Sequence, residues 1–227
     1  SGDGYMEDLH KAGGLVRILR EIRDLLDETA LTATGETLGA VIDRTYRQWP
    51  QNVVRPRHEP IFAAAGLAVV RGNLAPDGAV IKQSAAHPAL LQHTGRAVVF
   101  DGLGDLAERI DRDDLDVVES DILVLRYIGP KGAPGMPEAG LIPIPKKLAR
   151  QGVKDMVRIS DGRMSGTASG TIILHVAPEA AIGGPLALVQ SGDRICLDAA
   201  ARRLELLVSD DELARRRAAL QLPVTAP

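Results

Sequence analysis

The hydrophobic residues of this chain follow two different periods, one before a polar stretch and one after it. Across residues 14–29, GLVRILREIRDLLDET, leucine and isoleucine recur three and four positions apart, with charged residues between them. This spacing predicts an amphipathic helix. A shorter helix is predicted after Thr34, with Leu38, Val41 and Ile42 on its apolar side.

Beyond the polar stretch, short apolar and β-branched runs recur, and Gly, Pro, Asp or Asn residues separate them. Runs of this length and spacing predict β-strands that form a barrel or a sandwich, more than a parallel α/β sheet. We therefore expect a mainly β fold with peripheral helices (α+β). The runs cover residues 66–74, 79–84, 96–102, 121–127, 155–162, 170–176, 186–199 and 202–208.

The segments around these runs predict further local structure. Residues 191–193, Ser-Gly-Asp, suit the turn of a β-hairpin. A closing helix is expected after Ser209, because Glu212 three positions later completes a capping box. Short helices are also expected within residues 87–93, 103–110 and 144–151.

The polar stretch, residues 44–60, carries three prolines and has no clear period. Such a composition is typical of a linker. We therefore expect two regions: residues 1–55, a helical segment with a linker that ends a preceding domain, and residues 56–227, a C-terminal β-barrel domain. The first residues, SGDGYMEDLH, lack an initiator Met, so we expect a processed chain or a piece of a longer one.

Composition and charge narrow the class of protein. The 227 residues are 45% hydrophobic and 25% charged, with a net charge of −3 and a pI near 6.0. A nucleic-acid-binding protein would show a basic stripe, so we expect no nucleic-acid partner. No apolar run is long enough to span a membrane, and no signal peptide opens the chain. The single cysteine, Cys196, excludes an intrachain disulfide, and we expect a cytoplasmic protein.

Two loops have compositions that suggest chemistry. Residues 129–138, GPKGAPGMPE, contain three glycines and three prolines and end on the carboxylate of Glu138. A carboxylate held by a stiff, proline-rich backbone suits a hard cation. Residues 158–171, RISDGRMSGTASGT, are rich in Gly, Ser and Thr, and exposed N–H groups in such a loop bind anions. The alternatives are a solvated glutamate and an ordinary hairpin loop.

Ser165 lies in the second of these loops. A nucleophilic serine needs a histidine base and an acid, but none of the five histidines lies in a recognisable partner motif. A nearby cation can instead stabilise a serine alkoxide, as it stabilises metal-bound hydroxide. A third loop, residues 72–82, ends on Lys82, which could bind an anion; the alternative is a surface lysine with its charged end in water.

Together, the segments GLAVVRGNLAPDGAVIK, GPKGAPGMPE and DMVRISDGRMSGTASGTIILHV resemble the dihydroxy-acid and sugar-acid dehydratase family (the IlvD/Edd family). The likeness runs over essentially the whole chain. The segments KQSAAHPALLQHTGRAVVF and PIPKKLARQGVKDMVRISD look more like pentonate (arabinonate or xylonate) dehydratases than the branched-chain biosynthetic enzyme. The resemblance implies a swivelling, IlvD/LeuD-like β-barrel.

The resemblance also implies a hydro-lyase that dehydrates a 2,3-dihydroxy sugar acid to a 2-keto-3-deoxy acid. Such enzymes use an iron–sulfur cluster, [2Fe-2S] or [4Fe-4S], and Mg²⁺. By the family pattern Glu138 is a magnesium ligand, and Ser165 is the base in its alkoxide form. Thr167 lies beside that serine in the active site.

The cluster cysteines and the other magnesium ligands of the family lie in an N-terminal domain, and Cys196 matches no ligand motif. We therefore expect that domain to be the partner of this chain, a homo-oligomer as the full-length protein, and no activity from the chain alone. Two alternatives stay open. One is the dihydroxy-acid dehydratase of branched-chain amino-acid biosynthesis, and the other is a non-catalytic module that binds a carboxylate or closes over a site.

Overall fold

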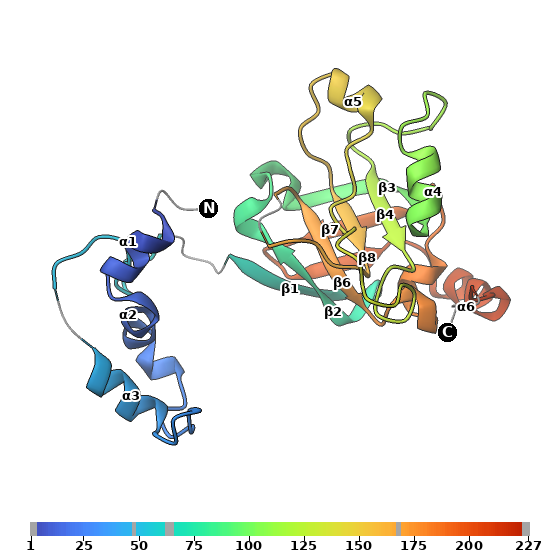
Figure 1. The fold of residues 1–227 in the computed structure, drawn as a ribbon. Helices are drawn as coiled ribbons and strands as arrows, with labels where there is room; N and C mark the ends of the chain where they lie inside the picture. The colour runs from blue at the N-terminus through green and yellow to red at the C-terminus, as the bar shows by residue number, and fades with distance from the viewer. Residues whose placement is uncertain (1–3, 47–48, 62–65, 167–168, 224–227) are drawn as a thin grey trace. The chain divides into compact units, whose positions relative to one another are not determined.

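The computed structural model describes residues 4–46, 49–61, 66–166 and 169–223, and the chain divides into two compact units. The first unit, Ser1–Ala64, is helical, and the second, Ala65–Pro227, is built around a β-barrel (Figure 1). The helices of the first unit are α1 (Met6–Lys11), α2 (Gly14–Glu21) and α3 (Leu38–Thr45), with a 3₁₀ turn, η1 (Arg23–Leu25), after α2.

The helix predicted over residues 14–29 is wrong beyond the end of α2. Ile22 leaves helical geometry, with φ at −112° and ψ at 18°, and the chain continues through η1. Asp27 then accepts hydrogen bonds from the backbone N–H and the hydroxyl of Thr29. Such a local side-chain turn competes with helix continuation, and the hydrophobic period does not reveal it.

The second predicted helix is confirmed as α3. Thr37 caps it, because its hydroxyl accepts a hydrogen bond from Ala40 N at 3.2 Å. Arg23 of η1 pairs with Asp43 at 2.6 Å and with Glu28 at 2.5 Å. These ion pairs join η1 and the residues after it to α3 within the first unit.

The eight described strands close into one barrel, in the order β1-β2-β6-β5-β4-β3-β7-β8 (Figure 1). The mainly β fold with peripheral helices is therefore confirmed, and each apolar run overlaps one strand. Strands β3, β4, β5 and β6 pair in parallel, and β1 meets β8 in one parallel bridge, while the other neighbours are antiparallel. The strands are β1 (Leu67–Gly72), β2 (Ala75–Lys82), β3 (Gln92–Asp101), β4 (Ile122–Arg126), β5 (Arg158–Ser160), β6 (Ile172–Ala177), β7 (Arg194–Asp198) and β8 (Arg203–Leu206).

The hairpin predicted at residues 191–193 is wrong. The segment before these residues forms a 3₁₀ helix, η5 (Pro185–Leu188), in place of a strand. Gly192 N and Asp193 O bond to the backbone of Ala97 on β3. Pro185 favours this outcome, because the fixed φ of proline suits the first position of a helix.

Hydrophobic residues of the barrel unit form two clusters. All eight strands contribute to the first, which fills the barrel interior. The second lies between the outer face of β3 and β4 and the helices α4 (Gly102–Arg109) and α5 (Lys146–Arg150), and Figure 1 shows α4 beside these strands. Leu123 and Val124 are neighbours on β4, yet they belong to different clusters and are both fully buried. Burial on both faces explains the unbroken apolar run of β4.

The remaining elements complete the surface of the unit. The predicted closing helix is confirmed as α6 (Asp210–Ala219), and the Ser209 hydroxyl accepts from Glu212 N at 3.4 Å. The helices predicted within residues 103–110 and 144–151 are confirmed as α4 and α5. The helix predicted within residues 87–93 is a 3₁₀ turn, η3 (Pro88–Leu90). The other short 3₁₀ turns of this unit are η2 (Gln83–Ala85) and η4 (Ala180–Ile182).

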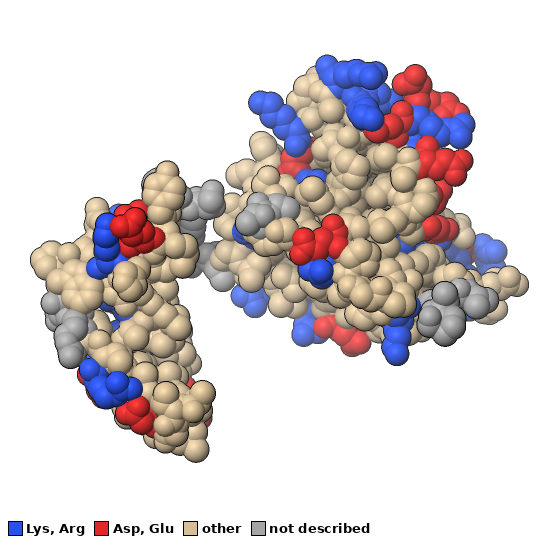
Figure 2. All heavy atoms as spheres, in the orientation of Figure 1, with Lys and Arg blue, Asp and Glu red and all other residues tan. Residues whose placement is uncertain are grey.

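Charge on the barrel unit is mixed. On the face that Figure 2 shows, acidic and basic side chains are interspersed, with the densest group near α5. Lys146 of α5 pairs with Asp111 at 2.7 Å, which is typical of that group. Within the described ranges, no helix combines the length and the apolar character that crossing a membrane requires.

Candidate functional site

Two segments of the barrel unit contain the predicted site residues. The proline loop, residues 127–142, follows β4, and the crossover, residues 161–171, connects the parallel strands β5 and β6. Arg163 joins them: its guanidinium binds Glu138 Oε1 at 2.6 Å through Nη1 and Met136 O at 2.7 Å through Nε. Gly140 N also donates to Arg163 O at 2.7 Å. The structure therefore brings the Glu138 loop onto the segment that carries the predicted serine.

Ser165 lies two residues after Arg163 and is partly buried. The next residue, Gly166, accepts a hydrogen bond from Lys82 Nζ at 2.7 Å. Lys82 is the last residue of β2, so β2 contributes to this part of the molecule in addition to β4, β5 and β6. Thr167, the other predicted catalytic residue, lies outside the described residues.

A buried carboxylate holds the beginning of the proline loop. Asp161, with 1% of its surface exposed, accepts hydrogen bonds from the backbone N–H groups of Tyr127, Ile128 and Ala180. Burial raises the pKa of Asp161, and these three donors oppose that effect. One side chain thus ties the end of β5 to the proline loop and to η4.

Glu179 holds the next part of the same loop. It is 8% exposed, and its two carboxylate oxygens accept from Lys131 N at 2.8 and 3.1 Å. A Cβ atom at Gly129 would lie 2.0 Å from Glu179 Oε2. The first glycine of the loop is therefore required by the close approach of this carboxylate.

A buried ion pair holds the end of the proline loop. Arg158, 4% exposed, donates to Leu141 O at 2.8 Å and to Ile142 O at 3.0 Å, and it pairs with Asp155 at 2.7 Å. Asp155 also accepts from the backbone and hydroxyl of Thr171. Burial alone would raise the pKa of Asp155, but the Thr171 donors and the Arg158 charge outweigh burial and lower it.

Three non-glycine residues of the proline loop have positive φ: Tyr127 at 67°, Met136 at 45° and Ile142 at 42°. Such conformations cost on the order of 1–3 kcal/mol each, and they persist only where the surroundings impose them. Each of the three bonds through its backbone to one of the charged side chains described above. The backbone conformation at these three positions is thus imposed by side chains of one short segment, residues 155–163.

The described residues supply only part of a metal site. Glu138 is half exposed and already paired with Arg163, and no group of three His, Cys, Asp or Glu side chains suited to a metal occurs among the residues described. Cys196, the single cysteine, lies on β7 opposite Glu205 of β8. An iron–sulfur cluster needs several thiolates. The residues that the structure describes therefore do not complete a magnesium site, and one cysteine cannot hold a cluster.

Sequence reasoning missed the charged side chains that organise the site. Arg163 and Asp161 lie inside a recognised motif, but their partners are distant in sequence. The signal that was available lies in DMVRIS, where Asp155 and Arg158 interrupt an apolar strand. Charges inside such a run are buried only when they are paired, so they predict a local ion pair.

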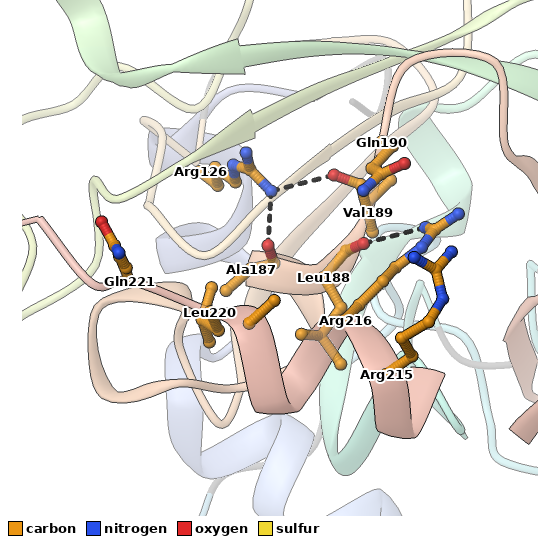
Figure 3. A pocket seen from close by; sticks show the side chains of 10 residues that line it. Arg126, Ala187, Leu188, Val189, Gln190, Arg215, Arg216, Leu220 and Gln221 are labelled. Atoms are coloured by element: carbon orange, nitrogen blue, oxygen red, sulfur yellow. Dashed lines mark hydrogen bonds between the residues drawn. The ribbon is translucent and has the colours of Figure 1, made fainter. Parts of the chain in front are cut away.

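A separate pocket lies beside α6 and is lined by Arg126, Gln190 and Arg216, among others (Figure 3). Its volume is about 270 Å³. The Arg126 guanidinium donates to the backbone carbonyls of Leu186, Ala187 and Val189 and pairs with Asp101. Arg216 donates to Leu188 O and pairs with Asp193 and Glu212. The third arginine of the lining, Arg215, pairs with Glu212. Because all three cations are already bonded within the protein, we assign no ligand to this pocket.

Comparison with known proteins gives a consistent result. The family model described as "Dihydroxy-acid/6-phosphogluconate dehydratase C-terminal" matches residues 52–226. An L-arabinonate dehydratase of Rhizobium leguminosarum bv. trifolii is 49% identical over 223 residues, which is 97% of this chain and 38% of that protein. A 6-deoxy-6-sulfo-D-gluconate dehydratase of Pseudomonas putida is 51% identical over 96% of this chain and 38% of that protein.

A third relative is named for a dihydroxy acid and not for a sugar acid. A dihydroxy-acid dehydratase of Lachnospira eligens is 45% identical over 97% of this chain and 39% of that protein. The chain thus spans about two fifths of the length of the curated relatives that it matches.

Proposed function

We propose, from the premise that this chain belongs to the dihydroxy-acid/6-phosphogluconate dehydratase family, that it is the C-terminal part of a hydro-lyase acting on a 2,3-dihydroxy sugar acid. The reaction removes one water: C2 loses a proton, C3 loses its hydroxyl group, and the enol becomes a 2-keto-3-deoxy acid. The observation that carries the proposal is the Glu138–Arg163 ion pair, which joins the proline loop to the crossover that holds Ser165.

In this proposal each predicted residue has one role. Ser165, as an alkoxide, accepts the proton from C2, and Thr167 is proposed as a second catalytic residue. Glu138 contributes one carboxylate to Mg²⁺. The remaining magnesium ligands and the thiolates of the iron–sulfur cluster come from an N-terminal segment of the same protein, because the chain has one cysteine and its described residues offer no cluster of metal-binding side chains. That segment is the proposed partner, in a cytoplasmic homo-oligomer.

A sugar acid is favoured over a branched-chain dihydroxy acid. The relatives named for sugar acids are 49% and 51% identical to this chain, and the dihydroxy-acid dehydratase is 45% identical. Turnover of the full-length parent should be compared on pentonates and on 2,3-dihydroxyisovalerate. The proposal predicts a higher kcat/KM for a pentonate, and a preference for the branched-chain substrate would assign the protein to the other branch.

The role of Ser165 is tested by Ser165→Ala in the full-length parent. Turnover should fall by about 10²-fold or more, because a positioned base contributes roughly that factor, while the melting temperature stays close to that of the parent. Ser169→Ala is the matched control, since Ser169 is an exposed serine of the same crossover. If Ser165→Ala retains activity, Ser165 is not the base and the non-catalytic module becomes the better interpretation.

A further inference from the structure

Lys82 contacts the crossover directly beside Ser165, although the two segments are far apart in sequence. Its ammonium donates to Gly166 O at 2.7 Å, and Lys82 itself is partly buried. The carbonyl that it binds follows Ser165 by one residue. A hydrogen bond at this position restricts rotation of the backbone that orients the serine side chain.

The backbone of Lys82 is itself well fixed. Lys82 pairs with Leu67 of β1, and its neighbour Ile81 pairs with Ile173 of β6 and is fully buried. Side chains alternate along a strand, so Ile81 points into the barrel and Lys82 points outward, toward the crossover. The cation is therefore carried by a strand that is paired on both sides, which makes it a rigid support.

The segment that follows β2 also holds the far end of the crossover. Gly170 N donates to Ala85 O at 2.8 Å, and His87 N donates to the Thr171 hydroxyl at 3.0 Å. Lys82 precedes these residues in the chain and contacts the crossover nearer to Ser165. Of these contacts, the hydrogen bond from Lys82 Nζ to Gly166 O is thus the one next to the proposed base.

We propose that Lys82 is a positioning residue for the dehydration, which holds the Ser165–Gly166 backbone so that the Ser165 oxygen faces C2 of the substrate. The inference rests on the proposed function of Ser165. It assigns to Lys82 no contact with the substrate. Loss of the ammonium is expected to slow proton abstraction, because a displacement of about 1 Å in a catalytic group costs on the order of 10²-fold in rate.

The test compares three variants of the full-length parent. Lys82→Met removes the ammonium and keeps the side-chain length, and Lys82→Arg restores a cationic donor. Lys147→Met is the matched control, because Lys147 is also partly buried and also donates to backbone carbonyls, those of Asp113 and Leu115, but lies on α5. Deuterium uptake over residues 162–166, kcat, KM and the primary isotope effect of C2-deuterated substrate are measured for each.

For Lys82→Met we expect faster uptake over residues 162–166, a kcat lowered by about 10- to 100-fold, a KM within about twofold, and a larger isotope effect at C2. Lys82→Arg should recover much of the rate, and Lys147→Met should change none of these values. A raised KM with unchanged kcat would overturn the proposal in favour of a substrate-binding lysine, and unchanged uptake would overturn the backbone role.

The activities of the unmodified parent and of Ser165→Ala separate this inference from the proposed function. If the unmodified parent turns over neither a sugar acid nor a dihydroxy acid, the proposed function fails, whatever Lys82 does. If the parent is active and Ser165→Ala is inactive, but Lys82→Met keeps full kcat with a normal isotope effect, only the role of Lys82 fails.

Discussion

At the residue scale, the buried pair of Asp155 and Arg158 supports both the proline loop and the crossover. Asp155→Asn would leave the Arg158 charge buried without its partner, and we expect the free energy of unfolding to fall by about 3 kcal/mol. Urea denaturation of the chain at neutral pH measures this loss. Asp114→Asn is the control, because Asp114 and Arg112 form a pair that is 69% and 55% exposed, and such a pair contributes less than about 1 kcal/mol.

The same variant has a predicted pH dependence. The pKa of Asp155 is lowered in the folded state from its ordinary value of 3.8, so the folded state binds this proton less readily than the unfolded state. The contribution of Asp155 is therefore complete above about pH 4 and is lost as the pH falls through the folded-state pKa. The stability difference between the unmodified chain and Asp155→Asn should be smaller at about pH 3 than at about pH 7. An equal stability difference at both pH values would contradict a lowered pKa of Asp155 in the folded state.

Which site residues the sequence could predict depends on where their partners lie. Glu138 and Ser165 lie in contiguous motifs, so family resemblance was enough to select them, and their roles stay predictions. Arg163 lies in the same motif as Ser165, but its contacts with the proline loop depend on a fold that joins residues 25 or more positions apart. For Lys82 the sequence leaves two alternatives, an anion-binding lysine and a surface lysine, and it does not reveal the contact with Gly166, which lies 84 positions away. Long-range polar contacts leave little pattern in one sequence.

At the element scale, local patterns predicted strands well and turns less well. Short apolar runs were enough to locate β1 to β8, because both faces or one face of each strand contribute to a hydrophobic cluster. The predicted helix was confirmed over residues 14–21 but was wrong over residues 22–29, where η1 and the Asp27–Thr29 hydrogen bonds form instead. The hairpin at 191–193 was wrong because η5, which begins with a proline, replaces its first strand. In both places the backbone depends on a polar side chain or a proline, and the spacing of hydrophobic residues carries no information about either.

The proline loop provides the prediction at this scale. Asp161→Asn would place an amide N–H₂ against at least one of the backbone donors that the carboxylate now accepts. We expect a loss of about 1–3 kcal/mol in the free energy of unfolding, because a buried donor is left unsatisfied. Deuterium uptake should rise at Tyr127 and Ile128, where the loop begins with a positive φ.

The control for this variant is Asp77→Asn, an exposed aspartate of the same unit. It should change neither the stability nor the uptake at the loop. If Asp161→Asn leaves uptake at residues 127–128 unchanged, then the buried carboxylate does not impose the loop conformation, and the covalent stiffness of the prolines is sufficient.

At the scale of the whole molecule, hydrophobic burial is uneven. Among the described residues of the first unit, Ala12 and Ile42 are the buried hydrophobic side chains, while both hydrophobic clusters lie in the barrel unit. Helix α2 is amphipathic, yet Leu15 on it is 66% exposed. Strand number and spacing predicted a barrel or a sandwich, and only the family resemblance selected the barrel. The parallel order of β3 to β6 was not predictable, because pairing of distant strands is decided by packing on both sheet faces.

The division of the proposed site between this chain and the rest of its parent leads to the last prediction. The chain holds one cysteine and, in Glu138, one proposed magnesium ligand already paired with Arg163. A cluster bound by thiolates and a cation held by several oxygens both need more ligands than that. We therefore expect the 227-residue chain to show no dehydratase turnover and no iron–sulfur absorbance after reconstitution with iron, sulfide and Mg²⁺. The full-length parent, treated identically, should show both, and Ser165→Ala in the parent should keep the absorbance while losing turnover. Turnover by the isolated chain at the rate of the parent would show that the crossover and proline loop form a complete site by themselves.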